Sequence, residues 1–414
     1  MNKERLKQDF YEAVNEEWQK TAKIPADKPA TGGFQDLVDG IDQLLMGETD
    51  DLLAHPEKVS SEKMKHFLAY YQLANDYDRR NELHAQPLQP VIEKVESLQS
   101  FDELNEQFPE WLLDTLPLPF NLDVDADMKN AQTNAFFAYP PSLFLPDKTY
   151  YAPEHPNGAQ LMGVFFDMAV QLLELAGKEK SQAEAITEQA VQFDKLIAPH
   201  VKSAEENADY SKMYNPQSFD TFIQYTDKLD LKKLVTGLIG TTPDKVIVTD
   251  PVYFDHLNDI LTEAHFPLFK SWMIIKTVRS LSGYLSEEFR QVSGIYSRVL
   301  SGTDEAMPQK KAAYYLASGQ FDQVVGDYYG KKYFGEAAKK DVEQMVKKMI
   351  AVYKKRLEEN DWLGDATKEK AVIKLNNLGI QVGYPDKIPA LFDQFKTVPA
   401  DQGGTLLSNT LAFS

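Results

Sequence analysis

The segment DWLGDATKEKAVIKLNNLGIQVGYPD, residues Asp361–Asp386, shows most clearly how this chain folds locally. Asp365 or Thr367 is suited to cap the first turn of a helix, because their side-chain oxygens can accept hydrogen bonds from free backbone amides. Apolar residues then recur every three or four positions up to Leu378, and Gly379 is typical of a helix end. The sequence therefore predicts an amphipathic helix here, with one face to bury against a neighbour.

The same helical spacing governs most of the chain, so we expect a mostly α fold. Apolar residues recur at intervals of three and four over long segments, which is typical of helices with one buried face. The clearest such segments are Lys63–Tyr77, Leu161–Ala176, Gln182–Ile197, Phe269–Tyr284 and Ala337–Glu359. Two short runs predict strands, Lys245–Thr249 and Ile380–Val382, and they are too sparse to form a parallel sheet as the core.

Length and composition indicate a folded protein of more than one compact unit. The chain has 414 residues and is 43% hydrophobic, which supplies enough apolar surface for two lobes. The polar loop Ser301–Lys311 marks the predicted boundary. We therefore expect a helical N-terminal domain over residues 1–300 and the start of a second lobe over residues 301–414.

The charge balance argues against polyanionic partners. With 63 acidic and 44 basic side chains the formal net charge is -19, which repels nucleic acid and anionic membrane surfaces. Basic clusters between Lys331 and Arg356 are interleaved with tyrosines, but acidic residues dilute them. We interpret these clusters as solvated helix faces and expect no nucleic-acid partner.

Cysteine usage and the N-terminal segment indicate a cytoplasmic protein. The chain has no cysteine, so it offers neither a disulfide framework nor a thiolate for zinc or catalysis. The opening residues, MNKERLKQDFYEAVNEEW, are charged and polar where a secretory signal needs an apolar segment. We found no run approaching the roughly 20 apolar residues of a membrane span, and we expect no membrane partner.

The sequence holds no local motif for metal, nucleophilic or nucleotide chemistry. A zinc hydrolase commonly carries two histidines four residues apart on a helix, with a glutamate between them that activates water. No such pair occurs, nor does a G-x-S-x-G elbow or a lysine-bearing phosphate loop. A composite metal site built from distant histidines stays open, but we expect no metal ligand and no catalytic residue in this chain. The histidines are His55, His66, His84, His155, His200, His256 and His265.

Ordered segments along nearly the whole chain resemble one peptidase family. They are DFYEAVNEEW (Asp9–Trp18), PPSLFLPDKTYY (Pro140–Tyr151), YNPQSFDTF (Tyr214–Phe222), VIVTDPVYFDHLNDIL (Val246–Leu261), FKSWMIIKTVRSLSGYLSEEF (Phe269–Phe289), GDYYGKKYF (Gly326–Phe334) and the segment quoted first. Their order and content resemble the neprilysin-type zinc metallopeptidases, the family that includes bacterial oligopeptidase O. Chance agreement of so many ordered segments is improbable.

The resemblance implies a fold and a function for a longer enzyme. In this family a multi-helical N-terminal lid lobe caps a chamber, and a zincin-like catalytic lobe carries an H-E-x-x-H zinc helix, a third ligand on an E-x-x-x-D helix, and an edge strand that holds substrate. None of these three motifs occurs here. The chain therefore resembles the lid lobe plus the beginning of the catalytic lobe. The resemblance implies zinc and oligopeptide substrates for the complete parent enzyme, and an inactive chain when it stands alone.

One residue can be carried over from the family as a substrate-binding candidate. In relatives, the loop after the opening segment holds an arginine and a phenylalanine that line the chamber near the substrate. In IPADKPATGGFQDL, Phe34 falls on that phenylalanine and Ala30 on the arginine. The resemblance thus implies that Phe34 contacts substrate, while Ala30 leaves recognition of a peptide carboxylate in doubt. A structural role stays open, in which Phe34 packs beside Leu37 and Ile41 on one helix face.

An alternative function belongs to a different class of protein. The alternative is a catalytically inactive helical module, derived from a peptidase lid, that binds peptides or a protein partner. Under the first interpretation, apolar residues after Asp361 lose their partners, and we expect self-association or mobility there. The residues concerned are Trp362, Leu375, Leu378, Ile380, Val382, Tyr384, Leu406, Leu407, Leu411 and Phe413.

Overall fold

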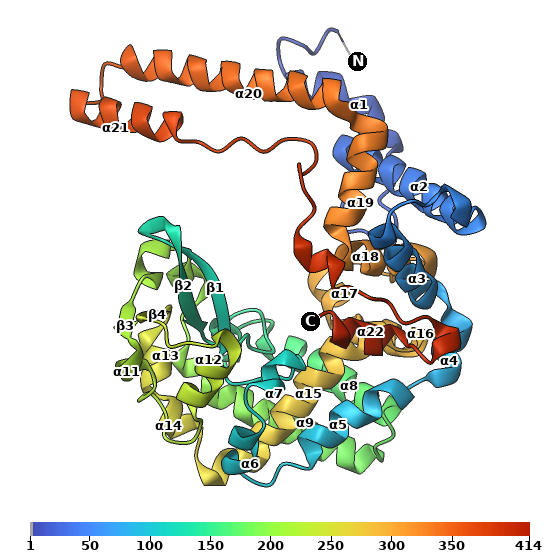
Figure 1. Cartoon of the computed structure of the whole chain (residues 1–414), viewed down its shortest axis with the longest axis vertical. Helices are drawn as coiled ribbons and strands as arrows, with labels where there is room; N and C mark the ends of the chain where they lie inside the picture. Colours follow the sequence, from blue (N-terminus) through green and yellow to red (C-terminus); the bar gives the residue numbers. More distant parts are fainter. Residues whose placement is uncertain (1–2) are drawn as a thin grey trace.

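The computed structural model describes residues 3–414 and shows a mostly helical molecule that curves into an open C (Figure 1). Helices α20 (Gly335–Glu358) and α21 (Asp365–Asn376) form an arm at one end of the C. A β-hairpin of strands β1 (Asn121–Asp127) and β2 (Asn130–Tyr139) lies at the other end and faces the arm across the opening. The expected mostly α, multi-helical fold is confirmed.

The main hydrophobic core lies around three long helices. Helices α8 (Gly158–Leu175), α9 (Lys180–Ile197) and α15 (Phe266–Leu281) pack together, and their buried faces follow the helical spacing of the sequence. Trp272 of α15 is 1% exposed and is among the largest side chains in this core. The periodicity thus predicted these helices to within about three residues at each end, as is usual for helix boundaries.

A small mixed sheet covers one side of this core. Its strand order is β1-β2-β4-β3, with β3 at Pro216–Ser218 and β4 at Lys245–Val248. Strands β1 and β2 are antiparallel, β2 and β4 are parallel, and β3 and β4 are antiparallel. The predicted strand at Lys245–Thr249 is confirmed. The hairpin escaped prediction because the exposed strand β1 reads NLDVDAD, which alternates but is rich in aspartate and asparagine, residues that are depleted in strands.

A second hydrophobic core joins distant parts of the chain. Helix α3 (Glu62–Asn75) packs with α18 (Gln309–Gln320), α19 (Asp322–Tyr329) and α22 (Leu406–Ala412). Phe321, which follows α18, is fully buried in this cluster. The packing runs across residue 300, so the predicted division into residues 1–300 and 301–414 does not separate the two cores and stays a prediction.

The end of the chain differs from its expected behaviour. Leu406, Leu407 and Phe413 are 3%, 1% and 9% exposed, and the ring of Phe413 stacks 4.7 Å from that of Phe395. The expectation that these residues lack partners is wrong, because α22 folds back against α3. Leu406 and Phe413 fill the second core, and Leu407 packs in the main core. By contrast Trp362 and Leu378, beside the arm, are 77% and 48% exposed.

The segment that begins at Asp361 also differs in detail. Gly364 caps α21 instead of Asp365 or Thr367, and the helix ends at Asn376, before Gly379. The predicted strand Ile380–Val382 is wrong: these residues are irregular and pair with no strand in residues 3–414. A short apolar run becomes a strand only when a neighbour supplies the ladder of hydrogen bonds, and none lies beside it.

The remaining helices connect these parts, and short polar side chains cap several of them. Asp9, Ser61, Ser100 and Ser286 each accept a hydrogen bond from a first-turn backbone amide. These helices are α1 (Phe10–Thr21), α2 (Gly33–Ala54), α4 (Tyr77–Leu83), α5 (Gln89–Glu96), α6 (Phe101–Glu106), α7 (Glu110–Leu113), α10 (Ala204–Asn207), α11 (Phe219–Phe222), α12 (Leu231–Ile239), α13 (Pro251–Asp255), α14 (Leu257–Ile260), α16 (Glu287–Ser293) and α17 (Ile295–Ser301).

Among the described residues, helix α8 is long and apolar enough to cross a membrane by length and composition. Its residues Phe165, Met168 and Leu173 are fully buried against α9 and α15. Buried core helices commonly meet the same criteria, so α8 is only weak evidence for a membrane span.

Candidate functional site

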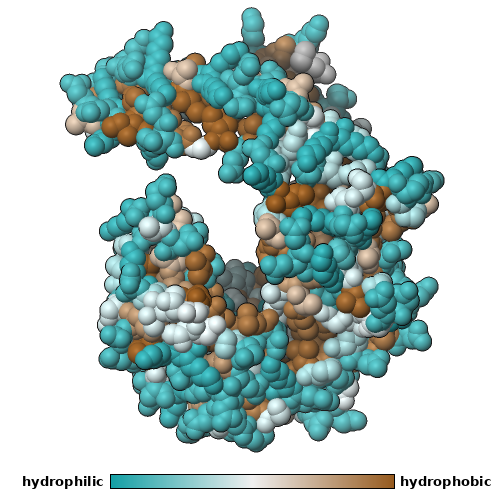
Figure 2. Space-filling view, in the orientation of Figure 1, coloured by the Kyte–Doolittle hydropathy of each residue, from teal (hydrophilic) through white to brown (hydrophobic). Residues whose placement is uncertain are grey.

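The open face of the C is the largest concave surface in the view of Figure 2. The hairpin lies on one side of this hollow, α20 and α21 close its top, and α19 with the second core borders it opposite the hairpin. We call this surface the chamber face. A concave surface shared by several rigid elements is a common setting for ligand binding.

The arm turns apolar side chains toward this hollow (Figure 2). On α20, Met345, Met349 and Val352 are 43%, 57% and 51% exposed. Ile373 of α21 is 45% exposed, and no residue of α21 is buried, so the face that the sequence predicted to be buried is not covered within the described residues. Exposed apolar side chains gathered on one element often mark a place where another molecule or domain binds. We call these four residues, together with Trp362 and Leu378, the arm patch.

Phe34, the predicted substrate-binding residue, lies in the first turn of α2. Its side chain is 87% exposed, and Leu37 and Ile41 along the same helix are 63% and 38% exposed. Phe34 therefore does not pack into either core of the described residues, which argues against the structural role considered from the sequence. Ala30, where relatives carry an arginine, is also exposed in the preceding loop. The substrate role of Phe34 stays a prediction.

The histidines are dispersed over the surface. His200 and His256 stack with ring centroids 4.0 Å apart, and His84 lies 3.6 Å from a carboxylate oxygen of Glu288. His66 accepts a hydrogen bond from the backbone amide of Thr397. Within residues 3–414 no three histidine or carboxylate side chains gather in a way that could hold a metal ion.

The partly buried carboxylate of Glu48 joins α2 to the segment from which the arm begins. Glu48 of α2 accepts hydrogen bonds from Lys332, Tyr333 and Tyr328, the last at 2.7 Å between Oε2 and the hydroxyl. These bonds lower the pKa of Glu48 to about 2, because they stabilise the ionised form. Lys332 and Tyr333 belong to the π-helical turn Gly330–Phe334, which lies where α19 gives way to α20. Glu48 therefore fixes the direction in which the arm leaves the body.

The loop after strand β2 is held by a second carboxylate. Asp194 of α9 is fully buried and accepts hydrogen bonds from the Phe144 amide at 2.9 Å, from Trp272 Nε1 at 3.0 Å and from the Tyr151 hydroxyl. Burial raises the pKa of Asp194 above its ordinary value. Three donors on one carboxylate make the conformation of the Pro140–Tyr151 loop well defined.

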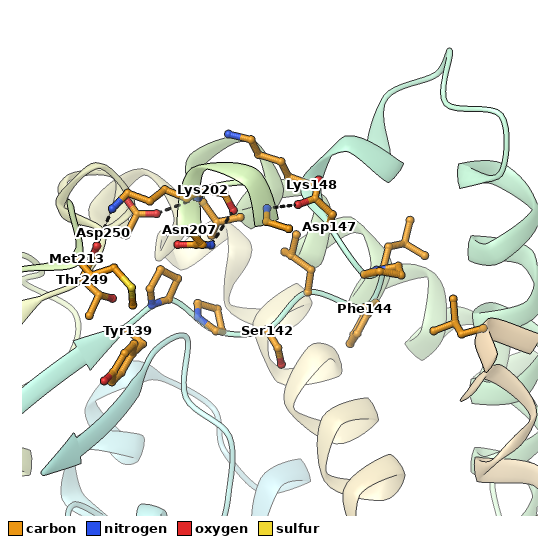
Figure 3. A pocket seen from close by; sticks show the side chains of 18 of the residues that line it. Tyr139, Ser142, Phe144, Asp147, Lys148, Lys202, Asn207, Met213, Thr249 and Asp250 are labelled. Atoms are coloured by element: carbon orange, nitrogen blue, oxygen red, sulfur yellow. Dashed lines mark hydrogen bonds between the residues drawn. The ribbon is translucent and has the colours of Figure 1, made fainter. Parts of the chain in front are cut away.

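That loop borders a pocket of about 620 Å³ (Figure 3). Tyr139, Ser142 and Phe144 lie on one side of it. Lys202 and Asp250 lie on the opposite side, joined by a hydrogen bond from the Lys202 amide to Asp250 Oδ2 at 2.9 Å. Helices α15 and α17 add Arg279, Tyr296 and Leu300. The pocket combines apolar walls with charged groups, as small-molecule sites do.

Comparison with known proteins identifies the family. The N-terminal model of peptidase family M13 matches residues 6–385. A solved structure of PepO from Lactobacillus rhamnosis HN001 superposes with a TM-score of 0.92 and is 33% identical, over 99% of this chain and 64% of that chain. The fold with its open chamber face is therefore that of a metallopeptidase of the neprilysin type. The chain belongs to peptidase family M13.

Curated relatives show which members of this family the chain is similar to. A putative zinc metalloproteinase of Streptococcus gordonii is 38% identical over 410 residues, which is 99% of this chain and 72% of the relative. A neutral endopeptidase of Lactobacillus helveticus is 37% identical over 392 residues, which is 94% of this chain and 60% of the relative. The chain thus spans somewhat under three quarters of the first of these relatives and somewhat under two thirds of the second. It corresponds to the N-terminal region of the family.

Sequence reasoning missed the residues that organise the site. Glu48 and Asp194 lie in ordinary acidic helices. The donors to Glu48 lie 280 or more residues away, and those to Asp194 lie 43 or more residues away. Arg279 lies in the segment Phe269–Phe289, which resembles a family segment, but that resemblance assigned it no role. The resemblance of Pro140–Tyr151 to a family loop pointed to the segment that Asp194 holds.

Proposed function

We propose that this chain is the substrate-chamber lid of a zinc metalloendopeptidase that hydrolyses oligopeptides in the cytoplasm. The observation that carries this proposal is the chamber face, an apolar-lined hollow on a chain at least 35% identical to neutral endopeptidases over most of its length. Such a wall excludes bulk water and offers apolar contacts to a bound peptide.

The proposal divides the chemistry between two parts of the enzyme. The zinc ion, when bound, supplies an activated water and polarises the scissile carbonyl. No group of residues 3–414 is arranged to hold that ion, so we assign the metal and the catalytic groups to another part of the parent enzyme. This chain alone is then inactive and binds no stoichiometric zinc.

Joining this chain to the catalytic part of a relative tests the proposal. The chain would be joined to the part of the Lactobacillus rhamnosis PepO that it does not match, and cleavage of a fluorescence-quenched oligopeptide would be followed. We expect hydrolysis that a chelator abolishes and zinc restores, with neither part active alone. A folded fusion that never cleaves, or an isolated 414-residue chain that holds tight zinc or cleaves the peptide, overturns the proposal.

Phe34 is tested in the same fusion. Because its exposed ring offers an apolar wall to the peptide, Phe34→Ser is expected to raise KM several-fold and leave kcat nearly unchanged. Leu391→Ser is the matched control, since Leu391 is 56% exposed and no family position assigns it to substrate. Equal KM values for the Phe34 variant and the parent fusion would remove Phe34 from the site.

A further inference from the structure

The pocket beside the Pro140–Tyr151 loop contains charged groups, most of which are satisfied within the protein. Lys148 forms an ion pair with Glu206 at 2.7 Å. Lys202 Nζ donates to the Thr249 carbonyl oxygen at 2.8 Å. Asp147 accepts hydrogen bonds from Thr149 and from the Ala204 amide. These groups shape the pocket but have little bonding capacity left for a ligand.

Arg279 is the exception among the basic residues of the pocket. Its guanidinium lies over the rings of Phe165 and Tyr296, 5.7 and 5.6 Å from their centroids. No hydrogen bond or ion pair joins it to any other residue of the described range 3–414. A guanidinium carries five N–H donors and stays charged, and its partial burial removes water that would otherwise satisfy them. An anion in the pocket would accept hydrogen bonds from these unpaired N–H groups.

Two further polar atoms of the pocket walls also lack partners. Tyr296 is 2% exposed, and its hydroxyl is buried without a hydrogen bond. Asp250 is 2% exposed, and its Oδ1 is likewise unpaired, although Oδ2 accepts from the Lys202 amide. Buried polar atoms in proteins are nearly always hydrogen-bonded, so two unpaired ones in the walls of one pocket point to a missing ligand. Asp250 repels an anion and favours an N–H donor, which sets the polarity of that ligand.

The size and walls of the pocket define the rest of the ligand. Its volume of about 620 Å³ falls within the range of small-molecule sites. Apolar walls come from the prolines that open the loop and from Leu143, Met213 and Leu300. A ligand that fills this space therefore has an apolar body as well as an anionic end.

We propose that this pocket binds a small amphipathic anion, with its carboxylate or phosphate on Arg279, an apolar body along the loop, and an N–H group toward Asp250. An acylated amino acid has all three features. Guanidinium pairs equally well with carboxylate and phosphate, so the two kinds of anion are separated by experiment. The site is independent of the proposed peptidase activity, because its residues all belong to this chain and need no metal.

Calorimetric titration of the 414-residue chain tests the site with three probes: N-acetyl-leucine, N-acetyl-leucinamide and inorganic phosphate. We expect N-acetyl-leucine to bind and its uncharged amide to bind at least tenfold more weakly. Arg279→Gln should weaken the acid at least tenfold. Arg356→Gln, which removes an exposed arginine of α20, should leave the affinity unchanged. Phosphate that binds in its place and depends on Arg279 would support the proposal with phosphate as the anion.

Two more variants keep the test sound if Arg279→Gln lowers stability. Leu300→Trp fills the apolar part of the pocket from a residue that is 46% exposed, so it should abolish binding in a folded protein. Tyr296→Phe keeps the ring under Arg279 and should weaken the acid by a smaller factor. Absence of binding by both acid and phosphate, or binding that neither Arg279→Gln nor Leu300→Trp alters, overturns the proposal.

Discussion

Single carboxylates decide how the elements of this protein meet. Glu48 collects a lysine and two tyrosine hydroxyls from α19 and the π-helical turn, and Asp194 collects an amide, an indole and a tyrosine hydroxyl from two further segments. A hydrogen bond to an ionised acceptor is stronger than a neutral one, so Glu48, whose pKa is lowered, holds its segments firmly. Asp194 holds its loop through three donors in a buried site. The positions of the arm and of the loop beside the pocket both follow from these residues.

Glu48→Gln should therefore destabilise the protein. The amide keeps the size of the side chain but loses the charge, and its NH₂ group cannot accept from the donors that now bond to Glu48. We expect a loss of about 1–3 kcal/mol in the free energy of unfolding at pH 7, measured by denaturant titration. Glu343→Gln is the matched control, since Glu343 pairs only with the exposed Lys347 one turn along α20 and should cost under about 0.5 kcal/mol.

The stability difference between the wild type and Glu48→Gln should depend on pH. The folded-state pKa of Glu48 is about 2, below its ordinary value of 4.5. The unfolded state therefore binds a proton first as the pH falls, and the stabilisation by Glu48 is fully present above about pH 5 and is lost toward pH 2. The stability difference between wild type and Glu48→Gln should shrink over this window. A difference that stays constant from pH 7 to pH 3 would contradict the assigned role.

At the scale of elements, strand β1 is an exposed edge of the sheet that the protein protects with its own side chains. The amides of Val124 and Ala126 donate to the carboxylates of the preceding Asp123 and Asp125, at 2.8 and 2.7 Å. Unprotected edge strands pair with other chains, and acidic residues along the edge prevent this. The acidic composition that concealed the strand from sequence analysis thus has a structural purpose.

Replacing both residues, Asp123→Val with Asp125→Val, should cause edge-to-edge association. The two amides become free and the strand becomes apolar, so we expect concentration-dependent oligomers by light scattering. Glu184→Val with Glu188→Val removes the same charge from the exposed face of α9 and serves as the control. If both double variants remain equally monomeric, the carboxylates of β1 have no protective role.

At the scale of the whole molecule, the arm patch is a surface without a partner in the described chain. Its members on α20 and α21 are 43–57% exposed, and these two helices border the hollow of the C. The C-terminal helix α22, in contrast, is packed in the second core. Any self-association of this chain is therefore expected through the arm patch, and not through the residues that follow Pro385.

The double variant Met349→Lys with Val352→Lys tests whether the chain self-associates through the arm patch. Charges on the exposed face of α20 should leave the fold intact, since neither side chain is buried, but should suppress the association of the 414-residue chain. Sedimentation velocity over a range of protein concentrations gives the measurement. A wild-type chain that is monomeric throughout that range would show that the arm patch does not self-associate.

The sequence by itself determined the long helices of the cores with their buried faces, and the family. These depend on contacts three or four residues apart and on ordered segments, which can be read along the chain. For α20 and α21 the sequence predicted the helix but not its exposure, since neither has a buried residue. It also predicted strand β4, because its β-branched run lies between prolines and folding supplies partners on both sides, β2 and β3. Helix ends were less accurate, as at α21, because a cap depends on the local path of the backbone.

Only the tertiary structure decided where the parts meet. Three features depend on side chains that folding brings together. Phe413 is buried against Phe395. Glu48 accepts a hydrogen bond from a residue more than 280 positions away, and Arg279 lies over aromatic rings without a hydrogen bond among the described residues. The error at Ile380–Val382 has the same origin, since a strand exists only with a neighbour. Pairing over long distances leaves no periodic signal in the sequence, and for that reason the chamber face and the pocket became visible only in three dimensions.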